Sequence, residues 1–143
     1  MPARFYEQNI SSKLSQKRKL SAFLDSLIVR HIKKIKVISI SYIFCDDAYL
    51  LSINKQFLKH DTFTDIITFD LSETIDELQA EIYISIERVR ENAEKFKEDY
   101  QSELHRVIFH GALHLCGFKD KVPADKKKMQ QMENKCLKGY FKI

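Results

Sequence analysis

The chain has 143 residues, of which 44% are hydrophobic and 31% charged, so we expect one globular domain over residues 1–143. No apolar run approaches the ~20 residues that span a bilayer, and the N-terminal MPARFYEQ lacks the apolar core of a signal peptide, which predicts a cytoplasmic protein without a membrane partner. The formal net charge of +4, with basic clusters at residues 17–19, 33–36 and 126–128, is compatible with a polyanionic partner but does not establish one.

The first part of the chain predicts two strands with a helix between them. Residues 3–7 form a short strand, and Ser11 or Ser12 then caps a helix whose apolar positions follow the spacing of a core-facing stripe. That stripe consists of Leu20, Phe23, Leu24, Leu27 and Ile28. The alternation in VISISYIF, residues 37–44, predicts a strand with one apolar face. That face consists of Ile38, Ile40, Tyr42 and Phe44.

A short helix and two further strands follow. Asp46 and Asp47 suit the N-terminus of the helix, because carboxylates interact favourably with the helix dipole there, and the helix runs through Phe57. The β-branched residues 65–71 predict one strand, and the alternating AEIYISI, residues 80–86, predicts the other.

Three helices complete the chain. Residues 87–97 predict a charged helix and residues 102–116 an apolar one, which Gly117 ends because glycine takes the left-handed conformation without strain. Pro123 suits the first turn of the last helix, and Gly139 is expected to stop it. The order β-α-β-α-β-β-α-α-α predicts an α/β fold of the α+β-like kind. We expect helices to cover a small mixed four-stranded sheet, with the helix over residues 102–116 in the centre.

Residues 107–121, VIFHGALHLCGFKDK, carry two histidines within an otherwise apolar segment. His110 and His114 are four residues apart, so at ~100° per residue of a helix they project from one face and can reach one metal ion. Their apolar neighbours offer no hydrogen-bond partners, and each unpaired buried imidazole would cost ~1–3 kcal/mol. A bound cation removes that cost, which favours a metal site over a pair of core histidines.

The residues after His114 supply a third ligand. The segment reads H-x-x-x-H-x-x-G-x-x-D, and its spacing equals that of the metzincin pattern H-E-x-x-H-x-x-G-x-x-H, in which the last histidine completes a zinc site. Asp120 takes that third place. Two histidines and one carboxylate leave a coordination position open, as a catalytic ion requires. We therefore expect a zincin-like helix that holds one divalent metal ion, with zinc as the first choice.

Two residues within this motif are expected not to take part in catalysis. Gly111 stands where metzincins carry their general base, and because glycine accepts no proton, peptide hydrolysis by that route is disfavoured. Cys116 lies ~240° round the helix from His110 and points away from the site. With Cys45 and Cys136 it forms no CxxC pair, which predicts reduced thiols and no disulfide framework. The sequence identifies no catalytic base.

These residues resemble the YbeY family of bacterial metalloendoribonucleases of ribosomal RNA maturation. The family signature H-G-x-L-H-L-x-G-[YF] is similar to HGALHLCGF, residues 110–118. Upstream, TDIITF at residues 64–69 resembles the family's T-D-V-L-S-F, and IN at residues 53–54 resembles its LN. The resemblance runs from about Tyr42 onward. It implies an α/β fold, a zinc ion, a cytoplasmic location and action on the RNA of the small ribosomal subunit.

Two positions depart from the family pattern. The third ligand, usually histidine, is Asp120, whose carboxylate makes the site less positive and broadens its metal preference toward Fe or Mn. The arginine that usually follows the aromatic residue after LN is replaced by Leu58. Lys59 or His60 could supply the missing cation: on an extended segment His60 returns to the side of Leu58, whereas on a helix neither aligns. We expect His60 to contact the phosphate of the substrate.

The leading hypothesis is a single-strand-specific metalloendoribonuclease that acts in maturation of small-subunit ribosomal RNA and in ribosome quality control. Its partners would be ribosomal RNA and the small ribosomal subunit, in an oligomeric state that the sequence leaves open. One alternative is a metallopeptidase-like hydrolase. Another is a non-catalytic, metal-stabilised module that binds RNA or the ribosome, for which Asp65 or His60 would have to close the metal shell as a fourth ligand.

Overall fold

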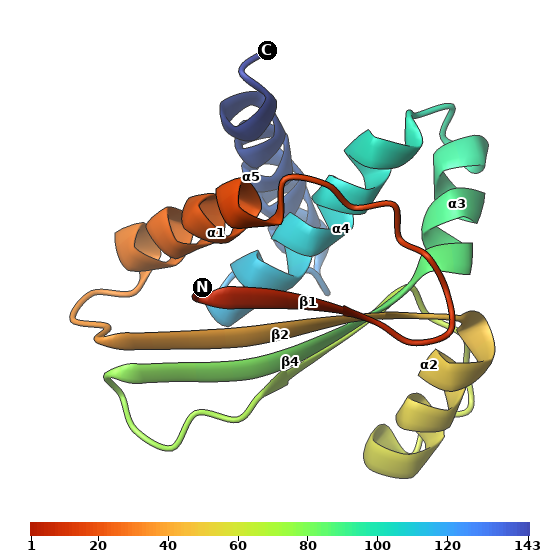
Figure 1. Ribbon diagram of the computed structural model, residues 1–143, viewed down its shortest axis with the longest axis horizontal. Coiled ribbons are helices and arrows are strands. Elements are labelled where there is room, and N and C mark those ends of the chain that lie inside the picture. Colours follow the sequence, from red (N-terminus) through yellow and green to blue (C-terminus); the bar gives the residue numbers. More distant parts are fainter.

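The secondary structure follows the predicted order of strands and helices. The computed structural model describes residues 1–143. Its elements are β1 (Ala3–Glu7), α1 (Lys17–His31), β2 (Val37–Cys45), α2 (Asp47–Ile53), β3 (Ile66–Asp70), β4 (Glu77–Ser85), α3 (Ile86–Lys95), α4 (Tyr100–Leu115) and α5 (Pro123–Phe141). Figure 1 shows them along the chain. A π-helix, η1 (Asn54–Leu58), continues α2, so the helical extent predicted through Phe57 is confirmed, whereas the change to π geometry at Asn54 was not predicted.

The four strands form one mixed sheet in the order β1-β2-β4-β3. β1 pairs with β2 and β2 pairs with β4 in parallel, whereas β3 pairs with β4 antiparallel. In this register Ile40 of β2 lies between Ala3 of β1 and Ala80 of β4. The prediction of a small mixed four-stranded sheet is therefore confirmed, and β1 and β3 are its two edges.

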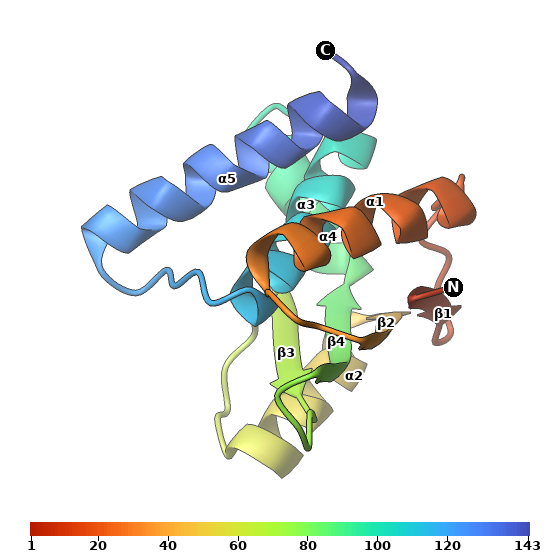
Figure 2. The same ribbon diagram turned by 90° about the vertical axis from the view of Figure 1, so that its left-hand side faces the viewer.

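Helices α1, α4 and α5 lie over one face of the sheet, and α2 lies on the other side (Figure 2). The alternation of β2 explains this asymmetry, because Ile40, Tyr42 and Phe44 all point to the α4 side and are at most 1% exposed. The hydroxyl of Tyr42 donates a hydrogen bond of 2.8 Å to the carbonyl oxygen of Ile108 in α4. The sheet and its central helix are thus joined by both apolar packing and a buried hydrogen bond.

Helix α4 lies close against the sheet, as the prediction of a central helix requires. A Cβ atom at Gly111 would lie 3.0 Å from the Cδ1 atoms of both Ile66 and Ile82. No larger residue fits there without displacing a strand side chain, so glycine allows the close approach of helix and sheet. The contact of Gly111 with Ile66 and Ile82 also places the histidines of α4 beside β3.

The predicted serine cap of the first helix is wrong. Helix α1 begins at Lys17, and Gln16 before it has a left-handed conformation (φ 55°) and makes no side-chain cap. Ser12 is fully buried and donates both its amide and its hydroxyl to the Glu7 carboxylate, at 2.6 and 2.7 Å. The carboxylate at the end of β1 is a stronger acceptor partner for the serine than the amides of a distant helix.

The predicted stop at Gly139 is also wrong, because α5 continues to Phe141. The next residue, Tyr140, is 3% exposed, and its ring lies 5.3 Å from that of Phe23 and 5.9 Å from that of Phe109. Burial of an aromatic ring gives more than the roughly 1 kcal/mol that a glycine costs inside a helix. The packing of Tyr140 therefore keeps the last turn helical.

The three cysteines are free thiols, as predicted, and burial raises the pKa of Cys116 to about 12 and that of Cys136 to about 11. Cys116 packs against the main core and does not line the cavity described below, so it is turned away from the histidines. None of the helices combines the length and the apolar character needed to cross a membrane.

Candidate metal centre

The end of α4 places both histidines at the open side of the sheet. Asp99 caps the start of the helix, and its carboxylate accepts a hydrogen bond from the amide of Ser102 at 3.3 Å. The chain turns just after the helix at Gly117, which has a φ of +100°, and the amide of Phe118 donates to the carbonyl oxygen of Leu113 at 3.0 Å. This turn reverses the chain and brings Asp120 back over the last two turns of the helix.

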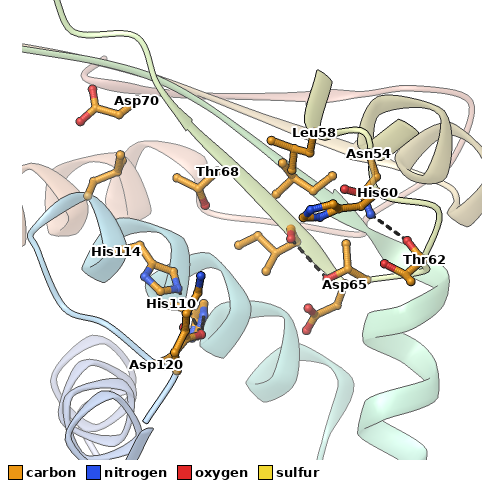
Figure 3. A pocket seen from close by; sticks show the side chains of 15 residues that line it. Asn54, Leu58, His60, Thr62, Asp65, Thr68, Asp70, His110, His114 and Asp120 are labelled. Carbon is orange, nitrogen blue, oxygen red and sulfur yellow. Dashed lines mark hydrogen bonds and ion pairs between the residues drawn. The ribbon is translucent and has the colours of Figure 1, made fainter. Parts of the chain in front are cut away.

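The three predicted ligands come together at this turn (Figure 3). Oδ2 of Asp120 lies 3.2 Å from Nε2 of His110 and 3.3 Å from Nε2 of His114. One ligand atom from each of the three residues lies within 4.8 Å of the others. Two imidazole nitrogens and one carboxylate oxygen at this separation form a donor set that suits zinc or a similar divalent ion.

The opposite nitrogen of each imidazole has its own partner. Nδ1 of His114 donates to the carbonyl oxygen of Phe118 at 2.9 Å, and Nδ1 of His110 donates to Oε2 of Glu133 at 2.6 Å. A carbonyl or carboxylate can only accept, so both Nε2 atoms are free to offer a lone pair to an ion. The expectation that these histidines lack partners was wrong, because it considered only the neighbours in α4.

Glu133 contacts one of the three candidate ligands, and the sequence did not identify it. It lies on α5, is 6% exposed, and its Oε1 accepts a hydrogen bond of 3.0 Å from Nη1 of Arg106. Arg106 also donates to Oδ1 of Asn134 at 2.8 Å. One sequence feature could have identified Glu133: it is a charged residue four positions after Met129, within the buried stripe of α5. Burial lowers the pKa of His110, but its hydrogen bond to Glu133 and the charges of Glu133, Asp120 and Asp65 raise that pKa above its ordinary value.

A cavity of about 700 Å³ opens over the three ligands. One wall is α4 with Lys121, and the facing wall is β3 with the loop before it. Polar side chains predominate in that facing wall: Asn54, His60, Thr62, Thr64, Asp65, Thr68 and Asp70. The ligand side chains of His110, His114 and Asp120 are 20%, 29% and 37% exposed, so a molecule in the cavity can reach them.

The segment around the missing arginine is helical and then turns sharply. Leu58 is the last residue of η1, Lys59 has a left-handed conformation (φ 56°), and the amide of His60 donates to the carbonyl oxygen of Asn54 at 3.2 Å. Leu58 and His60 both line the cavity, and Lys59 does not. The left-handed residue thus brings His60 back to the side of Leu58, although the segment is not extended.

His60 and Asp65 line the cavity without joining the group of three ligands. Burial raises the pKa of Asp65, and the nearby His110 partly offsets this. Gly111 faces Ile66 and Ile82, so a glutamate at the metzincin base position would have to displace these side chains. The cavity therefore differs from that of a metzincin in the residue next to the first histidine and in the oxygen of the third ligand.

A family model described as "Endoribonuclease YbeY" matches residues 5–140. The chain is 42% identical to the endoribonuclease YbeY of Parabacteroides distasonis over 137 residues, which are 96% of this chain and 94% of that protein. It is 59% identical to the endoribonuclease YbeY of Flavobacterium psychrophilum over 99 residues, 69% of this chain and 70% of that protein. The solution structure of TM1509 from Thermotoga maritima is similar with a TM-score of 0.60 at 25% identity, covering 97% of this chain and 89% of that one.

Proposed function

This chain belongs to the YbeY family of endoribonucleases, which makes it a hydrolytic endoribonuclease, and we propose that it cleaves single-stranded segments of ribosomal RNA with a divalent metal ion. The resemblance of its histidine motif to that family is thereby confirmed. The observation that carries the proposal is the convergence of two Nε2 atoms and one Oδ2 atom at the floor of an open cavity. We place this activity in a single domain over residues 1–143, in the cytoplasm, and in maturation of the small ribosomal subunit.

His110, His114 and Asp120 would hold the ion, and we propose zinc as the metal, with Fe or Mn as the ions that the carboxylate oxygen would also admit. A divalent ion bound there supplies Lewis acidity toward a phosphodiester. The protein itself orients the ligands, because Glu133 and the carbonyl oxygen of Phe118 hold the two imidazole rings from behind.

The side chains around the ligands are suited to hold a phosphate-bearing chain. Lys121 follows the third ligand directly and lines the cavity, and we propose that His60 contacts a phosphate from the opposite wall. Leu58 leaves the adjacent position without a cation. The basic clusters outside the cavity add a charge that attracts RNA without reading its sequence.

Two features of the site oppose the alternatives. Gly111 provides no general base, which opposes a metallopeptidase of the metzincin type. A structural metal would need a closed shell, but Asp65 and His60 stay outside the ligand group and the ligands remain partly exposed. Both features favour an ion that a substrate can approach.

The test combines metal analysis with a cleavage assay on freshly purified protein. We expect about one bound divalent ion per chain, cleavage of single-stranded ribosomal RNA that a chelator stops and added zinc restores, and intact protein substrates. His114→Ala should lose most of its metal and its activity, since two remaining ligands hold an ion poorly. RNA affinity should fall steeply with salt, because bound cations of the RNA are released. Proteolysis that a chelator abolishes, or stoichiometric metal in His114→Ala, would overturn the proposal.

A further inference from the structure

Strand β3 is an open edge of the sheet and also a wall of the cavity. Its one partner in the sheet is β4, and Ile66, Thr68 and Asp70 line the cavity that holds the metal ligands. Figure 3 shows Thr68 on this strand, across from His114. An edge strand presents a row of unpaired backbone N–H and C=O groups, which can pair with another chain.

The hydrogen bonds at the two ends of β3 define which residues present these groups. The carbonyl oxygen of Asp65 accepts from the amide of Ser85 at 2.9 Å, and the amide of Leu71 donates to the carbonyl oxygen of Gln79 at 2.7 Å. Antiparallel strands alternate between residues that bond to the partner and residues that face away from it. The odd-numbered residues of β3 thus bond to β4, and the backbone groups of Ile66, Thr68 and Asp70 face outward.

Thr68 presents the central pair of these outward-facing groups. The carbonyl oxygen of Ile66 accepts a long hydrogen bond of 3.5 Å from the hydroxyl of Thr64 and not from β4. This agrees with backbone groups of the even-numbered residues that face away from β4. Thr68 lies at the middle of the strand, opposite Ile82 of β4. Its N–H and C=O are therefore a donor and an acceptor side by side along the cavity.

We propose that the open edge of β3 hydrogen-bonds the edges of unpaired bases in the RNA substrate. This inference rests on the proposed function. It states that backbone groups of β3 recognise single-stranded RNA. A base in a duplex has already used its pairing groups, whereas an unpaired base can offer a donor and an acceptor to Thr68. Selectivity for single strands then follows without a base-specific side chain.

The charges along β3 itself support bases rather than phosphates there, whereas His60, our proposed phosphate contact, lies in the loop before the strand. The carboxylates of Asp65 and Asp70 flank the edge at its two ends and repel a phosphate placed along β3. Lys121 belongs to the opposite wall, beside the metal ligands, where a phosphate must lie to be cleaved. Neutral bases along β3 avoid the repulsion by Asp65 and Asp70. Phosphates beside the metal ligands lie where cleavage requires them.

The first test removes one backbone N–H. Proline is tolerated on an edge strand where its nitrogen faces away from the partner, so Thr68→Pro deletes the outward donor and leaves the ladder to β4 intact. Thr68→Val is the comparator, because both variants lose the hydroxyl but only the proline variant loses the N–H. At equal metal content, Thr68→Pro should bind single-stranded RNA about three- to tenfold more weakly than Thr68→Val. The slope of log affinity against log salt should be the same, because no phosphate contact is removed. Equal affinities of the two variants, both folded by circular dichroism, would overturn the inference.

The second test uses the unaltered protein and can overturn the inference even if Thr68→Pro does not fold. An RNA oligonucleotide with abasic residues keeps every phosphate but offers no base edges. We expect it to bind and to be cleaved at least about fivefold less well than the intact oligonucleotide. Equal treatment of the two RNAs overturns the role of the β3 edge while leaving the nuclease in place. An uncharged extended peptide that binds β3 as an added strand without displacing RNA would assign the edge to protein ligands instead. Failure of the parent protein to cleave any RNA would instead refute the proposed function.

Discussion

Glu133 of α5 accepts a hydrogen bond of 2.6 Å from Nδ1 of His110, whose Nε2 lies 3.2 Å from Asp120. The two residues are 23 positions apart in the sequence and belong to different helices. A buried carboxylate behind a metal-binding histidine fixes the orientation of the ring and raises its basicity. Arg106 holds the other oxygen of Glu133 at 3.0 Å, so the carboxylate itself cannot turn away.

We expect Glu133 to act as a positioning residue for the metal site. Glu133→Ala should weaken zinc binding by about 10- to 100-fold, because His110 loses its partner. Glu133→Gln should lose less, since its amide oxygen can still accept from Nδ1. Competition with a chromogenic chelator measures both. The exposed Glu94→Gln is the control and should bind zinc like the parent. A parental zinc affinity in Glu133→Ala would contradict this role.

The carboxylate of Asp120 should be replaceable by a third imidazole. Asp120→His restores a set of three nitrogens at the same spacing and should retain zinc, whereas Asp120→Ala should lose about 10-fold or more in affinity. Titration of metal-free protein with zinc, followed by calorimetry, measures the difference. Lys119→Ala changes an exposed residue of the same turn and serves as the control. If Asp120→Ala binds zinc as tightly as the parent, the third ligand lies elsewhere.

Two substitutions test the position of the missing arginine: one adds a cation at Leu58, and the other removes the imidazole of His60. Leu58→Arg places a cation in the cavity and should leave RNA cleavage unchanged or raise it, since Leu58 lines the same cavity as the ligands. His60→Ala should lower cleavage several-fold without loss of metal, because it removes a group that can contact phosphate. Lys59→Ala is the matched control, since Lys59 does not line the cavity. Normal cleavage by His60→Ala at full metal content would assign the phosphate contact to another group.

Stability should depend on the ionisation of Glu103 in α4. Burial raises the pKa of its carboxyl from 4.5 to about 7, with partial relief from Arg106, and the residue is 7% exposed. The folded state therefore keeps a proton that the unfolded state releases, and the contribution of Glu103 to stability falls as the pH rises from 4.5 to about 7. Glu103→Gln should gain stability over the parent as the pH rises through this window, by about 1–3 kcal/mol above pH ~7.

Urea unfolding of parent and variant at a series of pH values measures this difference. The exposed Glu94→Gln is the control and should follow the parent at every pH, because Glu94 is not among the charges that shift the pKa of Glu103. A difference between Glu103→Gln and the parent that stays constant from low to high pH would show that burial does not disfavour the charged carboxylate.

Local periodicity accounts for most of what could be predicted about the fold. The alternation of β2 and the i, i+3, i+4 stripe of α1 depend on neighbours within one element, and the structure confirms both. The expected serine cap and the stop at Gly139 failed for a different reason. In each case a contact with a residue outside the predicted helix decided the outcome: Glu7 binds Ser12, and the packing of Tyr140 on Phe109 prolongs α5.

The sequence by itself determined the metal-binding motif, because His110, His114 and Asp120 lie within one helix and the turn that ends it. Over so short a span, the geometry of the helix and of a left-handed glycine sets the distances between side chains. Only the tertiary structure placed Glu133 behind His110 and set His60 and the outward-facing edge of β3 beside the ligands. Those relationships depend on strand order and helix packing, which arise from burial of apolar faces far apart in the chain and have no fixed spacing in the sequence.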